Sequence, residues 1–195
     1  MKSGARYKNG FTLVEAVLVL GVAGLIFAIV FSALPALQTS SRDTTRESDI
    51  LDLISKIKEY QTNNRGALPT DTAYVDGDVF DACENTTGAT CNAYADAKDT
   101  TWRGFYRDYL GVKFMDPAGE HYSLSIVDCG AATDRACENA KLNSLYNSRF
   151  PYNNYDIIIV KGATCIGAEA AGSSNPRMVA AVYKMEGAGT FCAST

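Results

Sequence analysis

Six cysteines are the most reactive side chains in the sequence. A zinc site built from them would need C-x2-4-C knuckles, usually with histidine, and the chain has neither C-x-x-C nor more than one histidine. An even number of cysteines favours disulfides in an oxidising compartment. Six cysteines allow fifteen connectivities, and among these we expect the nearest-neighbour set: Cys83–Cys91, Cys129–Cys137 and Cys165–Cys192.

Groups that could act in catalysis are few. His121, the only histidine, stands near the start of an expected strand, where a solvated surface residue is the usual finding. The sequence has no H-E-x-x-H, G-x-S-x-G or P-loop motif. Asp76, Asp78 and Asp81 carry the oxygen ligands that calcium prefers, but they lack the EF-hand spacing and its glutamate at the twelfth position. We therefore expect a solvated acidic loop, no enzyme activity, no metal and no cofactor.

One carboxylate raises a different question. Glu15 interrupts a long apolar run almost at its start, in the stretch KNGFTLVEAVLVLG. An ionised carboxylate in hydrocarbon costs about 2.5–3.5 kcal/mol on insertion scales. Glu15 therefore needs a partner.

The apolar run is long enough to cross a membrane. Residues 16–37 contain no charged side chain, and at 1.5 Å per residue they extend about 33 Å, against about 30 Å for a bilayer core. A cleavable secretory signal usually has an apolar region of about 7–15 residues before a small-x-small site, whereas this run is longer and no A-x-A follows it. A plain signal anchor explains the length but leaves Glu15 unexplained.

The helix is expected to continue beyond the membrane segment. Apolar positions recur at the i, i+3, i+4, i+7 spacing of an amphipathic helix, at Ile50, Leu53, Ile54, Ile57 and Tyr60. Gly66 is expected as the C′ residue that ends it. We predict one helix over about 11–64, apolar all round in 11–37 and with one apolar face in 38–64. Pro35 is expected to kink it or melt it locally.

The start of this helix carries a family resemblance. GFTLVE followed by about twenty apolar residues resembles the type IV prepilin motif that pilins and pseudopilins share, and the ten-residue basic leader resembles that of a type IVa prepilin. In that family a membrane peptidase cuts after the glycine and methylates the new first residue. The resemblance implies removal of the leader 1–10, cleavage between Gly10 and Phe11, and methylation of Phe11.

The resemblance also implies a partner for Glu15, which becomes the fifth residue of the mature chain. After cleavage Phe11 carries a cationic amine among apolar helices, where a buried charge is tolerated only when it is paired. In the assembled filament Glu15 is expected to pair with the Phe11 amine of a neighbouring subunit, or else with its own. The helix macrodipole also favours a negative charge at this end.

Residues 65–195 have the length of one domain. A loop is expected over 70–100, and the aromatic side chains of 101–110 fall at helical spacing, which is typical of core packing. A turn is expected at Asp116–Gly119. Strands are predicted near 121–127, 155–161 and 177–185, with TFCAS as a last edge strand. The expected class is α+β, with the amphipathic half of the helix packed on an antiparallel sheet, as in the pilin fold.

The turn sequence DPAGEHY also resembles the DPWGNPY signature of the major pseudopilins of type II secretion. The match covers Asp116, Pro117, Gly119 and Tyr122 and departs at the other three positions. Aspartate and proline followed by glycine is ordinary turn chemistry, so this resemblance is weaker than that of the first 66 residues.

The charge balance limits the partners. The chain has 18 basic and 22 acidic side chains. When the three basic residues of the leader are removed, 15 basic side chains remain against 22 acidic ones. A body with that balance, −7, gives no general electrostatic reason to bind nucleic acid.

The resemblance implies a structural subunit of a type IV pilus, which serves adhesion, surface motility or DNA capture. It would be a single-pass membrane prepilin first and part of an extracellular pilus on a bacterial surface later. Its partners would be the prepilin peptidase, the pilus assembly machinery and further copies of itself in a helical filament. Two alternatives remain: a pseudopilin of a type II secretion or competence system, and a membrane-anchored secreted binding domain.

Overall fold

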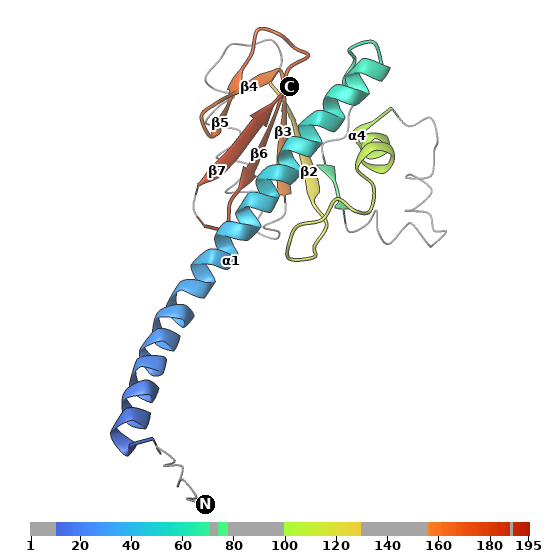
Figure 1. Cartoon of the computed structure of the whole chain (residues 1–195). Coiled ribbons are helices and arrows are strands. Elements are labelled where there is room, and N and C mark those ends of the chain that lie inside the picture. The colour runs from blue at the N-terminus through green and yellow to red at the C-terminus, as the bar shows by residue number, and fades with distance from the viewer. Residues whose placement is uncertain (1–10, 71–73, 78–99, 130–155, 188) are drawn as a thin grey trace, which may run out of the picture. The chain divides into compact units, whose positions relative to one another are not determined.

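The structure, a computed structural model, describes residues 11–70, 74–77, 100–129, 156–187 and 189–195. The chain divides into two compact units, Met1–Ser40 and Ser41–Thr195. Helix α1 (Leu13–Asn63) supplies the described part of the first unit and the start of the second, within two residues of the predicted bounds. The second unit adds strands and short helices (Figure 1), so the predicted α+β class is confirmed.

The elements that follow α1 are short. They are β1 (Tyr74–Val75), α4 (Trp102–Phe105), the π-helical turn η1 (Tyr106–Leu110), β2 (Ser123–Asp128), β3 (Asp156–Lys161), β4 (Ala163–Ile166), β5 (Glu169–Gly172), β6 (Val179–Lys184) and β7 (Thr190–Ser194).

Helix α1 behaves in the second unit as its periodicity predicts. The five predicted apolar positions are all buried: Ile50, Leu53, Ile54, Ile57 and Tyr60. The helix ends in a Schellman arrangement, in which the Gly66 N–H donates to the carbonyl of Gln61 at 2.6 Å. Arg65, with φ of 56°, takes the left-handed C′ position, so the assignment of Gly66 as C′ is wrong by one residue.

Helix α1 remains helical at Pro35. The local melting expected there does not occur, although the proline nitrogen has no hydrogen to donate. Alanine and leucine, the strongest helix formers, flank the proline on both sides and favour the helix around the missing hydrogen bond.

The main sheet has the order β1-β2-β3-β6-β7. The strands predicted from sequence correspond to β2, β3, β6 and the edge strand β7. The expectation of an antiparallel sheet is wrong at one place, since β2 and β3 pair in parallel while the other neighbours are antiparallel. Residues 129–155 connect β2 to β3, and a connection of a dozen residues or more is what parallel pairing requires.

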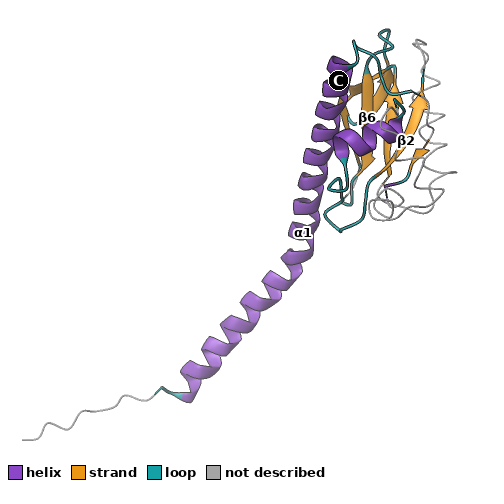
Figure 2. Cartoon of the chain, turned by 90° about the vertical axis from the view of Figure 1, so that its right-hand side faces the viewer, coloured by secondary structure: helices purple, strands orange, loops and turns teal. Residues whose placement is uncertain are grey.

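Alternate residues of the central strands serve two apolar layers. Ile157 and Ile159 of β3 belong to the cluster that contains the buried face of α1, whereas Ile158 and Val160 belong to a second cluster with the β4–β5 hairpin. Figure 2 shows the C-terminal part of α1 lying along one face of the sheet. The sheet is therefore buried on both faces, which explains why β3 is apolar without interruption.

The β4–β5 hairpin was not predicted from the sequence. It forms a two-stranded sheet of its own, and the disulfide Cys165–Cys192 joins it to β7. That disulfide was predicted. Cys129 is also disulfide-bonded, but Cys137 and the predicted pair Cys83–Cys91 lie outside the described residues.

The aromatic stripe and the proline turn were both predicted correctly. Trp102, Phe105 and Tyr106 are fully buried in the cluster beneath α1. At the turn, the Gly119 N–H donates to the Asp116 carbonyl at 2.8 Å, the i to i+3 bond of a β-turn.

The first prediction concerns the Cys165–Cys192 disulfide. Its two cysteines are 27 positions apart, and closing a loop of that length stabilises a fold by about 3.5 kcal/mol through the unfolded chain. We expect Cys192→Ser to lower the free energy of unfolding of the purified chain in detergent by that amount. Cys91→Ser, whose predicted loop is shorter, should cost less. A larger loss in Cys91→Ser would contradict the predicted pairing of Cys83 with Cys91.

A carboxyl group at the start of β3 makes stability depend on pH. Asp156 pairs in register with Ser123 of β2, and its buried Oδ1 accepts no hydrogen bond within the described part of the chain. Burial raises the pKa of Asp156 to about 6, the negative charge of Asp76 adds to the rise, and a hydrogen bond from Tyr74 opposes it. Because this pKa lies above the ordinary value of 3.8, the folded chain binds the proton more tightly than the unfolded chain does. The resulting stabilisation is complete below about pH 4 and is lost as the pH rises through 6.

The second prediction follows from that sign. Asp156→Asn keeps the shape of the side chain and removes the charge, so the variant should be more stable than the wild type at about pH 8, by about 1 kcal/mol at this partly exposed site. At about pH 4 the two proteins should unfold at the same temperature. Thermal unfolding at both pH values measures this, and an equal difference at the two would argue against Asp156 as the titrating group.

Candidate functional site

The amino-terminal end of α1 is closed by two of its own side chains. Thr12 precedes the first helical residue, and its N–H and hydroxyl both donate to Glu15 Oε2, at 2.9 and 2.8 Å. The Glu15 N–H donates in return to Thr12 Oγ1 at 3.3 Å. This reciprocal pair is a capping box, which satisfies backbone donors that have no partner within the helix. Glu15 thus has a local role besides the expected pairing with the Phe11 amine.

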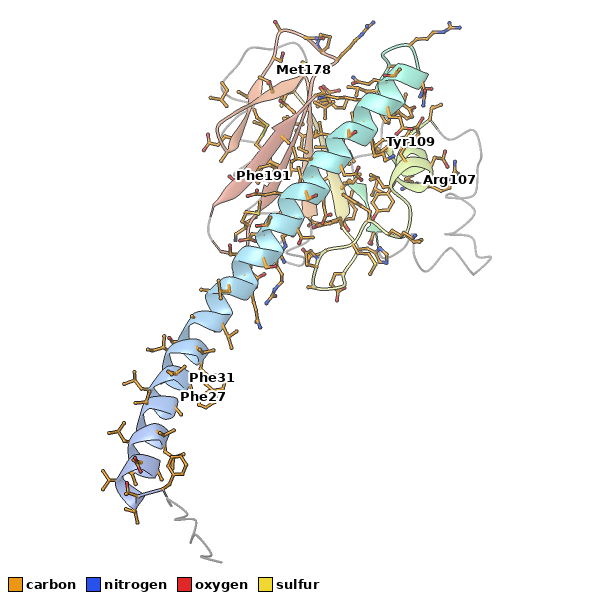
Figure 3. The ribbon with its side chains drawn as sticks, viewed as in Figure 1. Phe27, Phe31, Arg107, Tyr109, Met178 and Phe191 are labelled. Carbon is orange, nitrogen blue, oxygen red and sulfur yellow. A yellow bond between two sulfur atoms is a disulfide. The ribbon has the colours of Figure 1, made fainter. Side chains whose placement is uncertain are left out.

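The rest of the first unit presents apolar side chains all round. α1 includes a stretch long and apolar enough to cross a membrane, and none of that stretch is buried. Figure 3 shows Phe27 and Phe31 extending outward from it. The exposed large apolar residues of this unit are Phe11, Leu13, Val14, Val17, Leu18, Val19, Leu20, Val22, Leu25, Ile26, Phe27, Ile29, Val30, Phe31, Leu34 and Leu37. A soluble monomer rarely exposes an apolar surface of this extent.

The structure places only some of the predicted site residues. Phe11 is exposed just before the helix, and Glu15 lies in its first turn. Gly10 lies outside the described residues, as do Asp78 and Asp81 of the acidic stretch. His121 is half-buried rather than fully solvated. Within the described ranges, no three His, Cys, Asp or Glu side chains are grouped as metal ligands.

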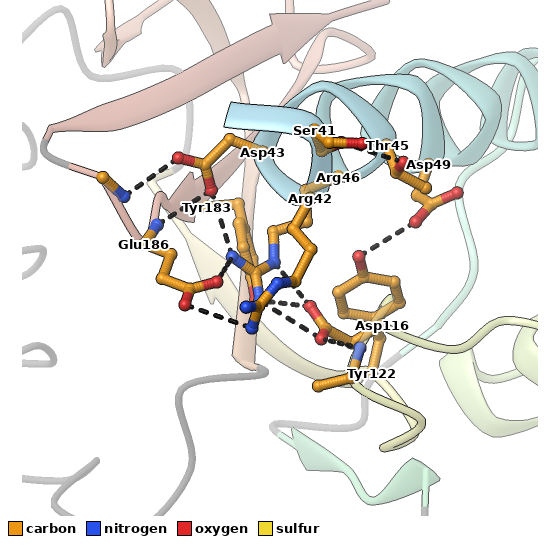
Figure 4. Close-up of polar contacts among 12 residues, drawn as sticks. Ser41, Arg42, Asp43, Thr45, Arg46, Asp49, Asp116, Tyr122, Tyr183 and Glu186 are labelled. Carbon is orange, nitrogen blue, oxygen red and sulfur yellow. Dashed lines mark hydrogen bonds and ion pairs between the residues drawn. The ribbon is translucent and has the colours of Figure 1, made fainter. Parts of the chain in front are cut away.

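The second unit contains a buried ion pair. Arg46 Nε lies 2.6 Å from Asp116 Oδ2, and its Nη2 lies 3.2 Å from Asp116 Oδ1. Arg46 is 5% exposed and Asp116 is 3% exposed, and such two-point contacts are the strongest arginine–carboxylate geometry. The Ala118 N–H donates to Asp116 Oδ1 at 2.7 Å. The pair therefore joins α1 to the proline turn that precedes β2 (Figure 4).

The same guanidinium reaches the turn between β6 and β7. Arg46 Nη1 lies 3.0 Å from both Asp43 Oδ1 and Glu186 Oε2, and Arg42 contacts Glu186 at 3.2 Å. The N–H groups of Glu186 and Gly187 donate to the two oxygens of Asp43, each at 2.9 Å. We call Arg42, Asp43, Arg46, Asp116 and Glu186 the anchor cluster.

Burial and hydrogen bonding set the charge states of the anchor cluster. Hydrogen bonds to Asp116 raise the pKa of Arg46 above its ordinary value, although burial lowers it. Partial burial raises the pKa of Asp43, but the hydrogen bonds from the Glu186 and Gly187 N–H groups, together with the hydrogen bond and positive charge of Arg46, bring it below the ordinary value. Arg46 and Asp43 are therefore both charged at neutral pH.

A second polar contact joins α1 to the region of the proline turn. The Tyr122 hydroxyl donates to Asp49 Oδ2 at 3.0 Å. Burial raises the pKa of Asp49 and also that of the Tyr122 phenol. Asp49 follows Arg46 by one turn of the helix, so both contacts secure the same part of α1.

Sequence reasoning missed the capping box and the anchor cluster. Each feature has a signal in the sequence. Thr12 and Glu15 fit the T-x-x-E pattern of a capping box. Arg46 falls in the i, i+4, i+7 register of the buried stripe, where a charged side chain needs a partner. The partner itself, Asp116, is 70 positions away and has no sequence signal beyond its turn.

Comparison of the chain with family models, curated proteins and solved structures finds no match. The function must therefore be argued from the chemistry of the two units.

The third prediction separates buried from exposed charge in the anchor cluster. Arg46→Ala leaves Asp116 buried without its counter-ion, which should cost about 3–5 kcal/mol. Arg42→Ala removes only a half-exposed contact with Glu186, which should cost less than about 1 kcal/mol. Urea unfolding of both variants in detergent measures the difference. Equal losses would mean that the Arg46–Asp116 pair does not hold α1 in place.

Proposed function

We propose that this chain is a structural subunit of a type IV pilus filament, made as a single-pass membrane prepilin and cleaved between Gly10 and Phe11. The observation that carries the proposal is the helix surface of the first unit, which is apolar on every side and begins with a charged side chain, Glu15. The prepilin-like order of leader, Gly10, Phe11 and Glu15 supports it.

That surface needs an apolar environment at each stage of the subunit's life. Before assembly the bilayer supplies it, since α1 is long enough to span one. In a filament the helices of neighbouring subunits replace lipid. The subunit then leaves the membrane without exposing these side chains to water.

Glu15 suits both environments because one of its carboxylate oxygens accepts the hydrogen bonds of the helix cap, while the carboxylate keeps its negative charge. Oε2 accepts two hydrogen bonds from Thr12, which reduces the cost of placing the carboxylate in an apolar medium. Cleavage before Phe11 would create an ammonium group one residue from Thr12. The negative charge of Glu15 would pair with that ammonium, on the same or a neighbouring subunit.

The second unit would form the outer part of the fibre in this proposal. Helix α1 is joined to it by the apolar stripe and the anchor cluster, so force along the helix would reach the sheet. At least one disulfide holds the edge strand β7 to the hairpin β4–β5, which suits a protein outside the cell. The prepilin peptidase and the pilus assembly machinery would be its transient partners.

A pseudopilin of type II secretion or competence is the second candidate. The observation in its favour is the proline turn. Asp116, Pro117, Gly119 and Tyr122 match the DPWGNPY signature, and residues 116–119 form a β-turn before β2. Labelling the native cell surface with an antibody to residues 65–195 distinguishes the two, since long decorated fibres indicate a pilus.

Mass spectrometry of the amino terminus tests the shared part of both candidates. We expect a first residue Phe11 with a methylated amine. An intact Met1 or a cut further along the chain would instead indicate a membrane-anchored secreted domain. Gly10→Leu should accumulate as full-length precursor, since a branched side chain would crowd the peptidase cleft.

The fourth prediction separates the two roles of Glu15. Glutamine can replace glutamate in a capping box but carries no charge, so Glu15→Gln keeps the cap and loses the ion pair, whereas Glu15→Ala loses both. If pairing with Phe11 is required, both variants should be cleaved normally and both should give at least about a hundredfold fewer fibres, because one unpaired buried charge costs about 3–5 kcal/mol. Fibre yield after shearing measures this. Normal yield from Glu15→Gln would mean that capping alone explains the residue.

A further inference from the structure

The outer face of α1 in the second unit carries one apolar side chain between two charges. Glu47, Leu51 and Lys58 are all exposed, and Leu51 is 55% exposed although its helix neighbours Ile50 and Leu53 are fully buried. At 100° per residue these three lie within about 40° of one another around the helix axis. They form one line along the helix, which we call the outer row.

Within the part of the chain that the structure describes, the two charged side chains of the outer row have no partner of opposite charge. Neither has one three or four positions away, where a helix places its neighbours, and neither forms an ion pair with the described residues. Other charges on the same helix are paired, such as Lys56 with Glu59 at 3.1 Å. Glu47 and Lys58 are themselves about 16 Å apart along the helix, at 1.5 Å per residue, too far for direct contact.

The side chains beside the outer row are small. Ser48, Ser55 and Thr62 are exposed on the same side of the helix. Two helices approach to about 8–10 Å when the contact residues are small. The surface therefore has an apolar centre, complementary ends and room for a second helix.

We infer that the outer row binds a second copy of this chain, displaced by about 16 Å along the helix so that Glu47 of one copy contacts Lys58 of the next. This inference rests on the proposed function and names the surface by which adjacent subunits meet. The charge pattern favours another copy over an unrelated partner. The outer row has one negative charge at one end and one positive charge at the other, so the acidic end of one copy complements the basic end of a second copy that is displaced along the helix.

The displacement between copies determines whether such contacts give a closed oligomer or an open fibre. Each copy uses Glu47 toward one neighbour and Lys58 toward the other, so the interface is heterologous, and a heterologous contact that does not close on itself gives an open fibre. A row of about three helical turns buries too little area for a stable isolated pair. The contact therefore has its effect when it is repeated along a filament.

Zero-length carbodiimide cross-linking of sheared fibres tests the contact directly. The reagent joins a carboxylate to an amine only where the two touch, so we expect a Glu47–Lys58 cross-link in fibres and none in the detergent-solubilised chain. Fibres of Glu47→Gln should lack it. A link from Glu47 to another protein, or no link at Glu47 in intact fibres, would overturn the inference.

The fifth prediction is a charge exchange. Glu47→Lys and Lys58→Glu should each lower fibre yield about tenfold, because like charges then face each other at every contact. The double variant Glu47→Lys/Lys58→Glu restores opposite charges and should regain wild-type yield within about twofold, since each exchanged pair is equivalent to the original.

Asp52→Lys is the matched control for this exchange. It makes the same change of charge on an exposed part of the same helix, about 140° away from Glu47 around the axis, and should leave the yield unchanged. Equal losses in Asp52→Lys and Glu47→Lys, or no recovery in the double variant, would contradict the outer row as the contact. If the wild-type chain forms no fibres at all, the proposed function itself fails, which is a separate result.

Discussion

Burial of one stripe of α1 against the sheet is the interaction on which the second unit depends. Ile50, Leu53 and Ile57 are completely buried, and each contributes about 1.5–3 kcal/mol by leaving water. The same contact covers the inner face of β3 and β6, whose outer face is covered by the β4–β5 hairpin. Without the helix the sheet would expose a large apolar face, so helix and sheet are stable only together.

The anchor cluster fixes where along α1 this contact begins. Apolar packing alone tolerates small displacements along a helix, because it has no direction. The two-point contact between Arg46 and Asp116 does not, since both partners are buried and a displacement would leave two charges without hydrogen bonds. Its net contribution to stability is small when the loss of water is included. Its effect is to select one register of helix against turn.

Much of the fold follows from local patterns in the sequence. The remaining parts could not be predicted because they depend on contacts between distant residues. The spacing of Ile50 to Tyr60 predicts α1 because helical periodicity is local, and the run of β-branched residues at 157–160 predicts β3. The hairpin of Ala163–Gly172 has too many alanine and glycine residues for such a signal, and forms through packing on the sheet and the Cys165–Cys192 disulfide. The parallel pairing of β2 with β3 depends on the path of residues 129–155, which no local pattern records.

The charges of α1 are neutralised in different ways, and the difference separates folding from assembly. Arg46 has its partners inside the second unit, so that charge is neutralised when the chain folds. Glu15 has hydrogen-bond donors within its own first turn but no cation there, and the amine proposed to pair with it would be created only by cleavage before Phe11. Glu47 and Lys58 have no cation or anion within reach on their own helix. Within one copy, the capping contacts with Thr12 account for the position of the Glu15 carboxylate at the start of the helix, but they supply no opposite charge for it. In the proposed assembly, further copies of the same helix would supply the missing opposite charges for Glu15, Glu47 and Lys58.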